Sequence, residues 1–209
     1  MPEATCSTCG KDILTVTAQA TGGLCRPCAR KQHWQRLAAE QATAPSEGAD
    51  DDLTPERAHA RARGLMVEPW FWDVCDGDSP FGNDTGADTL SFFREWRVKH
   101  PRKEPVAFLT SLLRQWEVRD TDWATMDGEA LRRVLPTDHF HVLTRDDTVI
   151  AVAFAQFALE GVVNPVVRER ALIAVRRQAL PEVIAFRGWV DPQERLKRLS
   201  RMKSVLEKA

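Results

Sequence analysis

Apolar residues recur with helical spacing along much of this chain of 209 residues. The clearest stretch runs from Asp147 to Glu160, where nearly every side chain is apolar, and Gly161 follows it as a helix C-cap. A helix that is apolar on all sides belongs in the centre of a bundle. This stretch therefore predicts the core of a helical domain.

Prolines in the first helical turn indicate where other helices begin. Several follow a residue suited to the N-cap, because a short polar side chain there accepts a hydrogen bond from the first turn. The helix starts predicted in this way are Pro55 after Thr54, Pro105, Pro165 after Asn164, and Pro192 after Asp191. The pattern predicts a mostly helical domain.

Two of these helices show a clear division into faces. After Pro105 the apolar residues line one side of a helix, namely Phe108, Leu109, Leu112, Leu113 and Trp116. Over residues 166–179 we expect a helix with four arginines on its outer, solvent-exposed face: Arg168, Arg170, Arg176 and Arg177. A final helix is expected from Pro192 to about Lys208.

Four cysteines near the start form two Cys-x-x-Cys pairs, Cys6 with Cys9 and Cys25 with Cys28. This spacing indicates a structural zinc site, because two such pairs complete a tetrahedron with no open position. A segment this short, with few large apolar side chains, buries too little surface to fold without a bound metal ion. A redox dithiol or two disulfides are the alternatives; the matched pairs argue against the first and the lack of a signal peptide against the second.

The cysteine segment resembles the treble-clef zinc fingers. It combines a knuckle, a predicted hairpin around residues 14–20, and a helix after Cys28 that runs to about Gln41. The resemblance implies a fold and no partner. We thus expect a mainly α protein, with a small treble-clef-like zinc finger followed by a helical bundle domain.

A change of composition separates these parts. Small, acidic and Pro/Gly-bearing residues without an apolar period follow the finger's helix, which is typical of a flexible linker. The predicted organisation is a four-cysteine zinc finger with its C-terminal helix over 1–42, an acidic linker over 43–53, and a helical domain over 54–209.

Composition narrows the classes of function. The net charge of -1 argues against nucleic-acid binding by the chain as a whole. The longest apolar run, residues 149–159, is shorter than the roughly 18 residues of a membrane span. We expect a cytoplasmic protein without membrane contact, in which Cys75 is a reduced thiol buried near Trp72.

Residues 69–90 form the most unusual stretch, with short acidic side chains beside glycines. An EF-hand starting at Asp76 fails, because Pro80 and Phe81 occupy the third-ligand and turn-glycine positions. One interpretation is a loop that Trp70, Phe71, Trp72 and Phe81 anchor to the core, ending in a helix with Thr85 as cap. The other is a loop that binds a cation or a basic partner, through Asp76, Asp78, Asn83, Asp84 and Asp88.

Opposite charges gather in different parts of the chain. The C-terminal part is basic, with Arg187, Arg195 and Arg198 among its cations, whereas the stretch around Asp76 and Asp78 is acidic. These parts either pair within the molecule, form two binding faces, or are solvated surfaces without a partner.

Several motifs together resemble the YfeS-like uncharacterised bacterial proteins. They are Trp72-Asp73 with the Ser-Pro-Phe-Gly-Asn-Asp segment from Ser79, the stretch from Phe108 to Trp116, and Ile150-Ala-x-Ala-Phe-Ala-Gln with Glu160-Gly161. The resemblance covers residues 65–205. It implies a bacterial cytosolic helical domain without assigned catalytic residues, to which the zinc finger is an addition.

Three functions fit these observations. The first is a non-catalytic, zinc-binding protein-interaction or regulatory protein with an unidentified protein partner. The second is nucleic-acid binding by the finger's basic helix, through Arg26, Arg30, Lys31, Trp34 and Arg36. The third is a metal-dependent hydrolase that uses Asp76, Asp78, Asp84 and Asp88. A metal site at His139-x-His141 on an extended segment is a weaker alternative, since no third ligand is evident.

Overall fold

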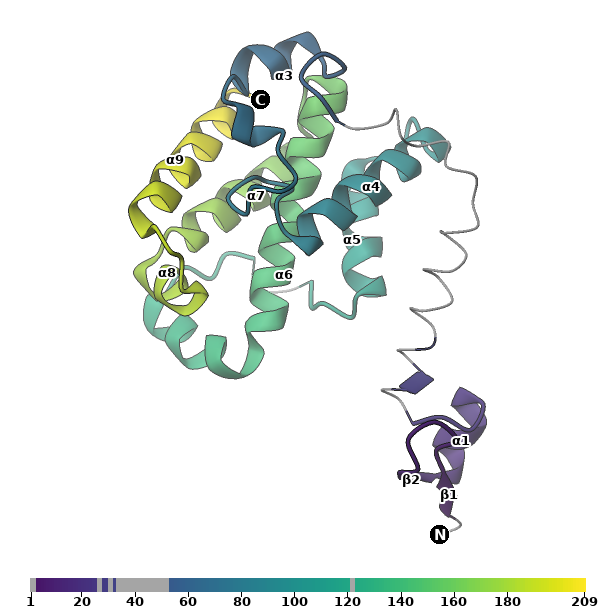
Figure 1. The fold of residues 1–209 in the computed structure, drawn as a ribbon. Coiled ribbons are helices and arrows are strands. Elements are labelled where there is room, and N and C mark those ends of the chain that lie inside the picture. The colour runs from purple at the N-terminus through teal and green to yellow at the C-terminus, as the bar shows by residue number, and fades with distance from the viewer. Residues whose placement is uncertain (1–2, 26–27, 30–31, 33–52, 121–122) are drawn as a thin grey trace. The chain divides into compact units, whose positions relative to one another are not determined.

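The structure, a computed structural model, describes residues 3–25, 28–29, 32, 53–120 and 123–209. The chain divides into two compact units, Met1–Asp52 and Leu53–Ala209 (Figure 1). Of the predicted linker over 43–53, only Leu53 is described, and it packs against the core of the second unit. The linker and its exact ends stay predictions.

Two short antiparallel strands open the first unit. β1 (Glu3–Thr5) pairs with β2 (Asp12–Leu14). The register places Ala4 opposite Ile13. The first cysteine pair lies in the turn that connects the strands.

Helix α1 (Thr15–Thr21) follows β2 directly. The hairpin predicted around residues 14–20 is therefore wrong, because β-branched residues there form a helix. The hydroxyl of Thr21 donates to the carbonyl of Thr17 at 2.7 Å, one helical turn earlier. Cys28 and Ala29 are helical, but the predicted helix beyond them lies largely outside the described residues.

All secondary-structure elements in the described part of the second unit are helices, which confirms the mainly α fold. A 3-10 turn, Pro69–Phe71, lies between the first two helices. The helices are α3 (Ala60–Leu65), α4 (Asp84–Lys99), α5 (Pro105–Gln115), α6 (Gly128–Glu160), α7 (Pro165–Gln178), α8 (Pro181–Arg187) and α9 (Pro192–Lys208).

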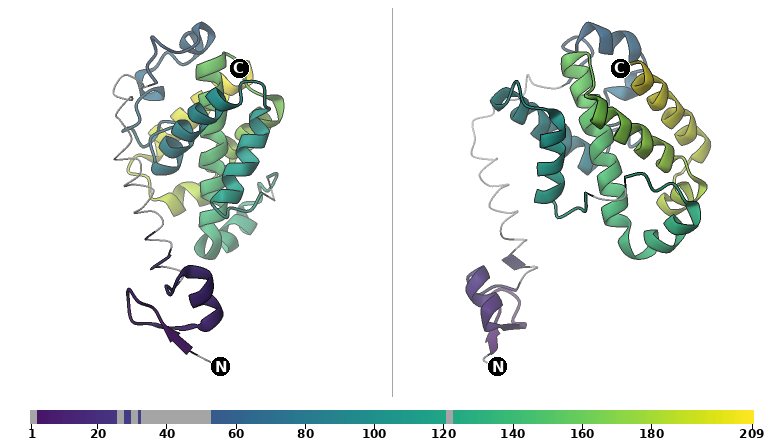
Figure 2. Two further views of the ribbon diagram at one scale, coloured as in Figure 1. Left: turned by 90° about the vertical axis from the view of Figure 1, so that its right-hand side faces the viewer. Right: turned by 180° about the vertical axis from the view of Figure 1, so that it is seen from behind.

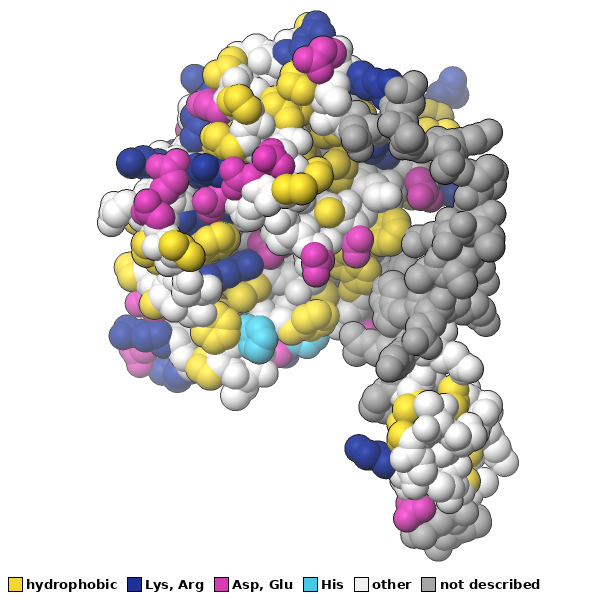
Figure 3. Space-filling model, viewed as in Figure 1, with side chains coloured by type: hydrophobic (Ala, Val, Ile, Leu, Met, Phe, Trp, Pro, Cys, Tyr) yellow, Lys and Arg dark blue, Asp and Glu magenta, His cyan; other side chains and the backbone are white. Residues whose placement is uncertain are grey.

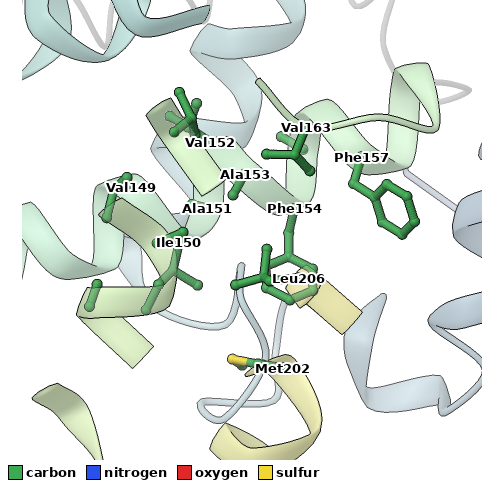
Figure 4. Close-up of a cluster of buried hydrophobic side chains, with 14 of the residues drawn as sticks. Val149, Ile150, Ala151, Val152, Ala153, Phe154, Phe157, Val163, Met202 and Leu206 are labelled. Carbon is green, nitrogen blue, oxygen red and sulfur yellow. The ribbon is translucent and has the colours of Figure 1, made fainter. Parts of the chain in front are cut away.

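Helix α6 is the centre of this unit, and Figure 2 shows it among the other helices from two sides. α3, α4, α5, α7 and α8 contact it, and α9 packs on α7. Every residue over 148–158 is buried, so the predicted core is confirmed. Figure 4 shows part of the cluster, with Phe154 of α6 and Leu206 of α9. Gly161 ends α6 in the left-handed conformation, as predicted.

The first part of α6 was not predicted. α6 begins at Gly128 and bends at Asp138, whose φ of -137° departs from helical geometry. Leu131, Leu135 and Val142 form a small second core with Val183 of α8. Burial of these side chains explains why a segment with a proline and two histidines continues as a helix. The expectation that His139-x-His141 lies on an extended segment is therefore wrong.

The helix starts at Pro105, Pro165 and Pro192 are confirmed. The one predicted at Thr54-Pro55 is wrong, because α3 begins only at Ala60. The backbone N–H of His59 donates to the carbonyl of Ala158 in α6, at 2.8 Å. That tertiary bond sets where α3 can begin, and it is not visible in the local sequence.

No helix in the described residues is both long and apolar enough to span a bilayer.

Candidate metal centre

Four cysteine side chains converge in the first unit. The Sγ atoms of Cys6, Cys9, Cys25 and Cys28 all lie within 4.8 Å of one another. Those of Cys9 and Cys25 are 3.6 Å apart. A tetrahedral ion with metal–sulfur bonds of about 2.3 Å holds its sulfurs about 3.8 Å apart. The four thiols therefore have the separation that a single metal ion requires.

Backbone hydrogen bonds position the two cysteine pairs. The N–H of Cys6 donates to the carbonyl of Lys11 at 2.8 Å, which closes the turn between β1 and β2. The N–H of Ser7 donates to the carbonyl of Gly23 at 3.1 Å and so brings the second pair to the first. The small core around the sulfurs contains Ile13 and Leu24 as its largest aliphatic side chains. Because so little apolar surface is buried, metal binding is the main available source of stability.

The crowded sulfurs compete for protons. The backbone N–H of Cys25 lowers the pKa of the Cys6 thiol to about 6. Hydrogen bonds with the side chains of Cys25 and Cys9 raise the pKa of Cys28 to about 12. A divalent cation removes this conflict, because it binds all four side chains as thiolates.

The basic residues assigned to a nucleic-acid site lie outside the described residues. They are Arg26, Arg30, Lys31, Trp34 and Arg36. That hypothesis stays a prediction.

The acidic loop after Trp72 pairs with α9. A carboxylate oxygen of Asp76 lies 2.6 Å from the guanidinium of Arg198, and that of Asp78 lies 3.2 Å from Arg195. Burial opposes ionisation of Asp76, but hydrogen bonds from Arg198 and from the N–H of Asp78 outweigh it and lower its pKa. Of the interpretations left open for these charges, pairing within the molecule holds for both residues. Figure 3 shows cationic side chains beside acidic ones on this face of the helical unit.

The other residues of the acidic stretch begin α4. The side chain of Asn83 accepts a hydrogen bond from the N–H of Gly86 at 2.9 Å, so Asn83 caps the helix and the prediction of Thr85 is wrong. Burial and the neighbouring charge of Asp84 raise the pKa of Asp88. Among the residues that the structure describes, the four cysteines are the one group of three or more side chains placed to share a metal ion. The carboxylates of Asp76, Asp78, Asp84 and Asp88 do not form such a group.

The aromatic anchors of this loop were predicted correctly. Phe71 and Phe81 are fully buried, and Phe71 stacks on Phe154 with ring centroids 5.6 Å apart. The indole of Trp72 donates to the carbonyl of Met66 at 2.9 Å. Cys75 is a free and exposed thiol, so its predicted burial is wrong.

The sequence did not predict a buried ion pair in the helical unit. Arg177, expected on the outside of its helix, is fully buried and forms an ion pair with the equally buried Asp146 of α6. Its remaining nitrogen donates to the carbonyls of Trp123 and Thr125, at 3.0 and 2.9 Å. A signal for this was present in the sequence. Arg177 falls three residues after Ala174, on the same helix face as other small apolar residues of α7.

Comparisons with known proteins give a distant similarity. No protein-family model matches the chain, and no solved structure matches it. The chain is 25% identical over 143 residues to the uncharacterised protein YfeS of Escherichia coli K12. The matched part is 68% of this chain and 58% of YfeS, so it spans less than two thirds of that relative. The resemblance to YfeS is thereby confirmed, and the relative's name assigns no activity.

Proposed function

We propose that this protein is a non-catalytic zinc protein of the bacterial cytosol that acts by binding another protein. The observation that carries the proposal is the set of four cysteine sulfurs within 4.8 Å of one another. Tetrahedral coordination by four thiolates leaves no position for water or substrate, which is typical of structural zinc. Zinc is favoured over an iron–sulfur cluster, because the four sulfur atoms are close enough together to bind one single ion.

A folded finger outside the helical unit supports a binding function. The two units have separate cores, and the second needs no metal ligand from the first to bury its own apolar residues. A small module that a bound metal ion stabilises can serve as a recognition surface of its own. Two modules on one chain also allow bivalent binding of a partner.

The hydrolase hypothesis loses support from the geometry of its carboxylates. Asp76 and Asp78 are held by Arg198 and Arg195, so a metal ion there must displace both arginines.

The test is affinity purification of the intact protein from bacterial lysate, with and without nuclease. The variant is Cys6→Ser/Cys9→Ser, and the control is Cys75→Ser, which removes an exposed thiol outside the cluster. We expect about one zinc per chain by elemental analysis in the wild type and the control. We also expect a nuclease-resistant protein partner that the variant loses. Retention of nuclease-sensitive material alone would instead support nucleic-acid binding by the finger, and a chain without zinc would contradict the proposal.

A further inference from the structure

A groove lies between α4 and α5, which Figure 2 shows as neighbours joined at one end by residues 100–104. Its volume is about 230 Å³. The floor is apolar, formed by Phe92, Trp96, Phe108 and Leu112. The rim is polar and exposed, formed by Glu95, Lys99, Ser111 and Gln115. Pockets for cofactors or drug-sized ligands have about 300–1,000 Å³, so this groove is better suited to side chains from a partner.

The spacing of the lining residues repeats on both helices. α4 contributes positions 92, 95, 96 and 99, and α5 contributes positions 108, 111, 112 and 115. Each set follows the i, i+3, i+4, i+7 pattern, which is one continuous helix face. Two such faces on either side of a groove form the surface onto which a third helix packs.

Aromatic side chains fill the space between the two helices. The ring of Trp96 lies 5.4 Å from that of Phe108, and Phe92 lies 6.4 Å from Trp116. These pairs also show that the helices run in opposite directions. Phe108 and Leu112 are buried beneath the groove, whereas Phe92 and Trp96 are only partly covered. The groove is therefore preformed, which lowers the entropic cost of binding.

The end of the groove at residues 100–104 carries positive charge. Lys99, Arg102 and Lys103 are all exposed. Glu95 lies 3.8 Å from Lys99, but within the described residues Arg102 and Lys103 have no carboxylate within 4.0 Å. The carboxylate of Glu104 is already engaged, because it accepts a hydrogen bond from the side chain of Asn164 at 2.6 Å. The cations of Arg102 and Lys103 therefore select an acidic partner.

We propose that the α4–α5 groove binds an amphipathic helix of a partner protein, with apolar side chains in the groove and acidic side chains against Arg102 and Lys103. The inference rests on the proposed function, since it names the chemistry of a protein partner. It assigns recognition to the helical unit, independently of the finger.

The test uses a fluorescently labelled helical peptide of about 18 residues, long enough to form a helix when bound. The peptide has leucines at i, i+3, i+4 and i+7 and glutamates elsewhere. A matched peptide has lysines in place of the glutamates. Anisotropy titrations with the full-length protein should show that the acidic peptide binds at least about tenfold more tightly at low salt. Salt should reduce the difference, because exposed charges are screened.

Two pairs of variants locate the peptide. Ser111→Trp fills the groove from its exposed rim, and its control is Ser200→Trp at an exposed position of α9. Arg102→Glu/Lys103→Glu reverses the charge at the end of the groove, and its control, Arg176→Glu/Lys197→Glu, makes the same charge change on α7 and α9. We expect Ser111→Trp to weaken binding about tenfold or more and the charge reversal to weaken it by about three- to tenfold. The controls should bind like the wild type.

Several results would overturn the proposal. They are equal binding of the two peptides, no binding of the acidic peptide, or equal loss in Ser111→Trp and Ser200→Trp. A labelled single-stranded oligonucleotide serves as a further arm. If it binds and is blocked by Ser111→Trp while the acidic peptide is not, the groove takes nucleic acid and the proposal is wrong.

The finger provides the means to separate the two proposals. Cys6→Ser/Cys9→Ser should leave peptide binding unchanged, because the groove lies wholly in the second unit. If the wild-type protein captures no protein partner but binds the peptide, only the proposed function of the finger is contradicted. Zinc-dependent capture without peptide binding contradicts only the groove.

Discussion

At the scale of single residues, the pair formed by Asp146 and Arg177 is the most constrained feature of the helical unit. Both side chains are 0% exposed, and two hydrogen bonds of 2.8 and 2.5 Å join them. Burial raises the pKa of Asp146, and the guanidinium of Arg177 opposes that rise. Because desolvation offsets much of the attraction, such a pair contributes little net stability. Its effect is to hold residues 123–125 against α6 and α7.

Removing one partner leaves the other charge buried and unpaired. We expect Arg177→Met to lower the free energy of unfolding by about 3–5 kcal/mol. Arg176→Met, at the exposed neighbouring position, should change it by less than about 0.5 kcal/mol. The measurement is denaturant unfolding of the full chain. The double variant Asp146→Leu/Arg177→Met should recover part of the loss. If Arg177→Met and Arg176→Met lowered the free energy of unfolding equally, the pair would not be buried as described.

At the scale of elements, local signals predicted helix starts well where a proline stands in the first turn. α5, α7 and α9 begin at the expected prolines, and α6 ends at Gly161. The predicted helix boundaries were wrong where contacts with residues distant in sequence determine them. The first half of α6 depends on Val183, and the start of α3 depends on the carbonyl of Ala158.

The two glycines that end α6 and α8 allow a matched comparison. Gly161 and Gly188 have φ of +71° and +64°. A Cβ at Gly161 would clash with the imidazole of His59, whereas at Gly188 nothing lies within 4 Å. Alanine in this conformation costs about 1–2 kcal/mol at either position. We expect Gly161→Ala to cost about 1–3 kcal/mol more, because His59, which caps α3, must move.

Thermal unfolding of the two alanine variants measures this difference. His59→Ala in the Gly161→Ala background should remove the clash and so reduce the additional cost. If Gly161→Ala and Gly188→Ala were equally destabilised, the close approach of His59 would not exist in solution.

At the scale of the whole molecule, the pairing between the acidic loop and α9 joins residues about 120 positions apart in the chain. From the sequence, pairing of the acidic and basic parts was one of three open interpretations, and the pairing residues were not identified, because no local pattern specifies a contact at that separation. The four cysteines are the opposite case. Their spacing alone predicted that their side chains would gather, since each Cys-x-x-Cys pair can offer two sulfurs to the same ion.

The pairing predicts a dependence on pH. The pKa of Asp76 and that of Glu68, which Arg201 contacts, lie below their usual values. Each carboxylate therefore favours folding above its unfolded pKa of about 4, and this contribution is lost as the pH falls through the folded pKa. Arg198→Met should lower the free energy of unfolding at pH 7 and do so less at pH 3. A destabilisation that is the same at both pH values would contradict this pairing.

Removal of the metal should unfold the first unit and leave the second unit folded. A chelator is expected to unfold the cysteine segment, because little apolar surface stabilises it, and to leave the helical unit folded. Thiol counting measures the change: Cys75 should react rapidly before chelation, and all five cysteines after it. Circular dichroism should retain most of its helical signal. Cooperative loss of all helicity with the metal would show that the units do not fold independently.

The contacts between arginine and tryptophan also give the protein an optical property. Trp70, Trp96, Trp123 and Trp189 each lie within about 5 Å of a guanidinium. Six of the seven tryptophans belong to the helical unit, and the chain has no tyrosine. The ultraviolet emission of the protein therefore comes from tryptophan, and a shift in that emission can reveal a broken arginine contact while the helices are still intact.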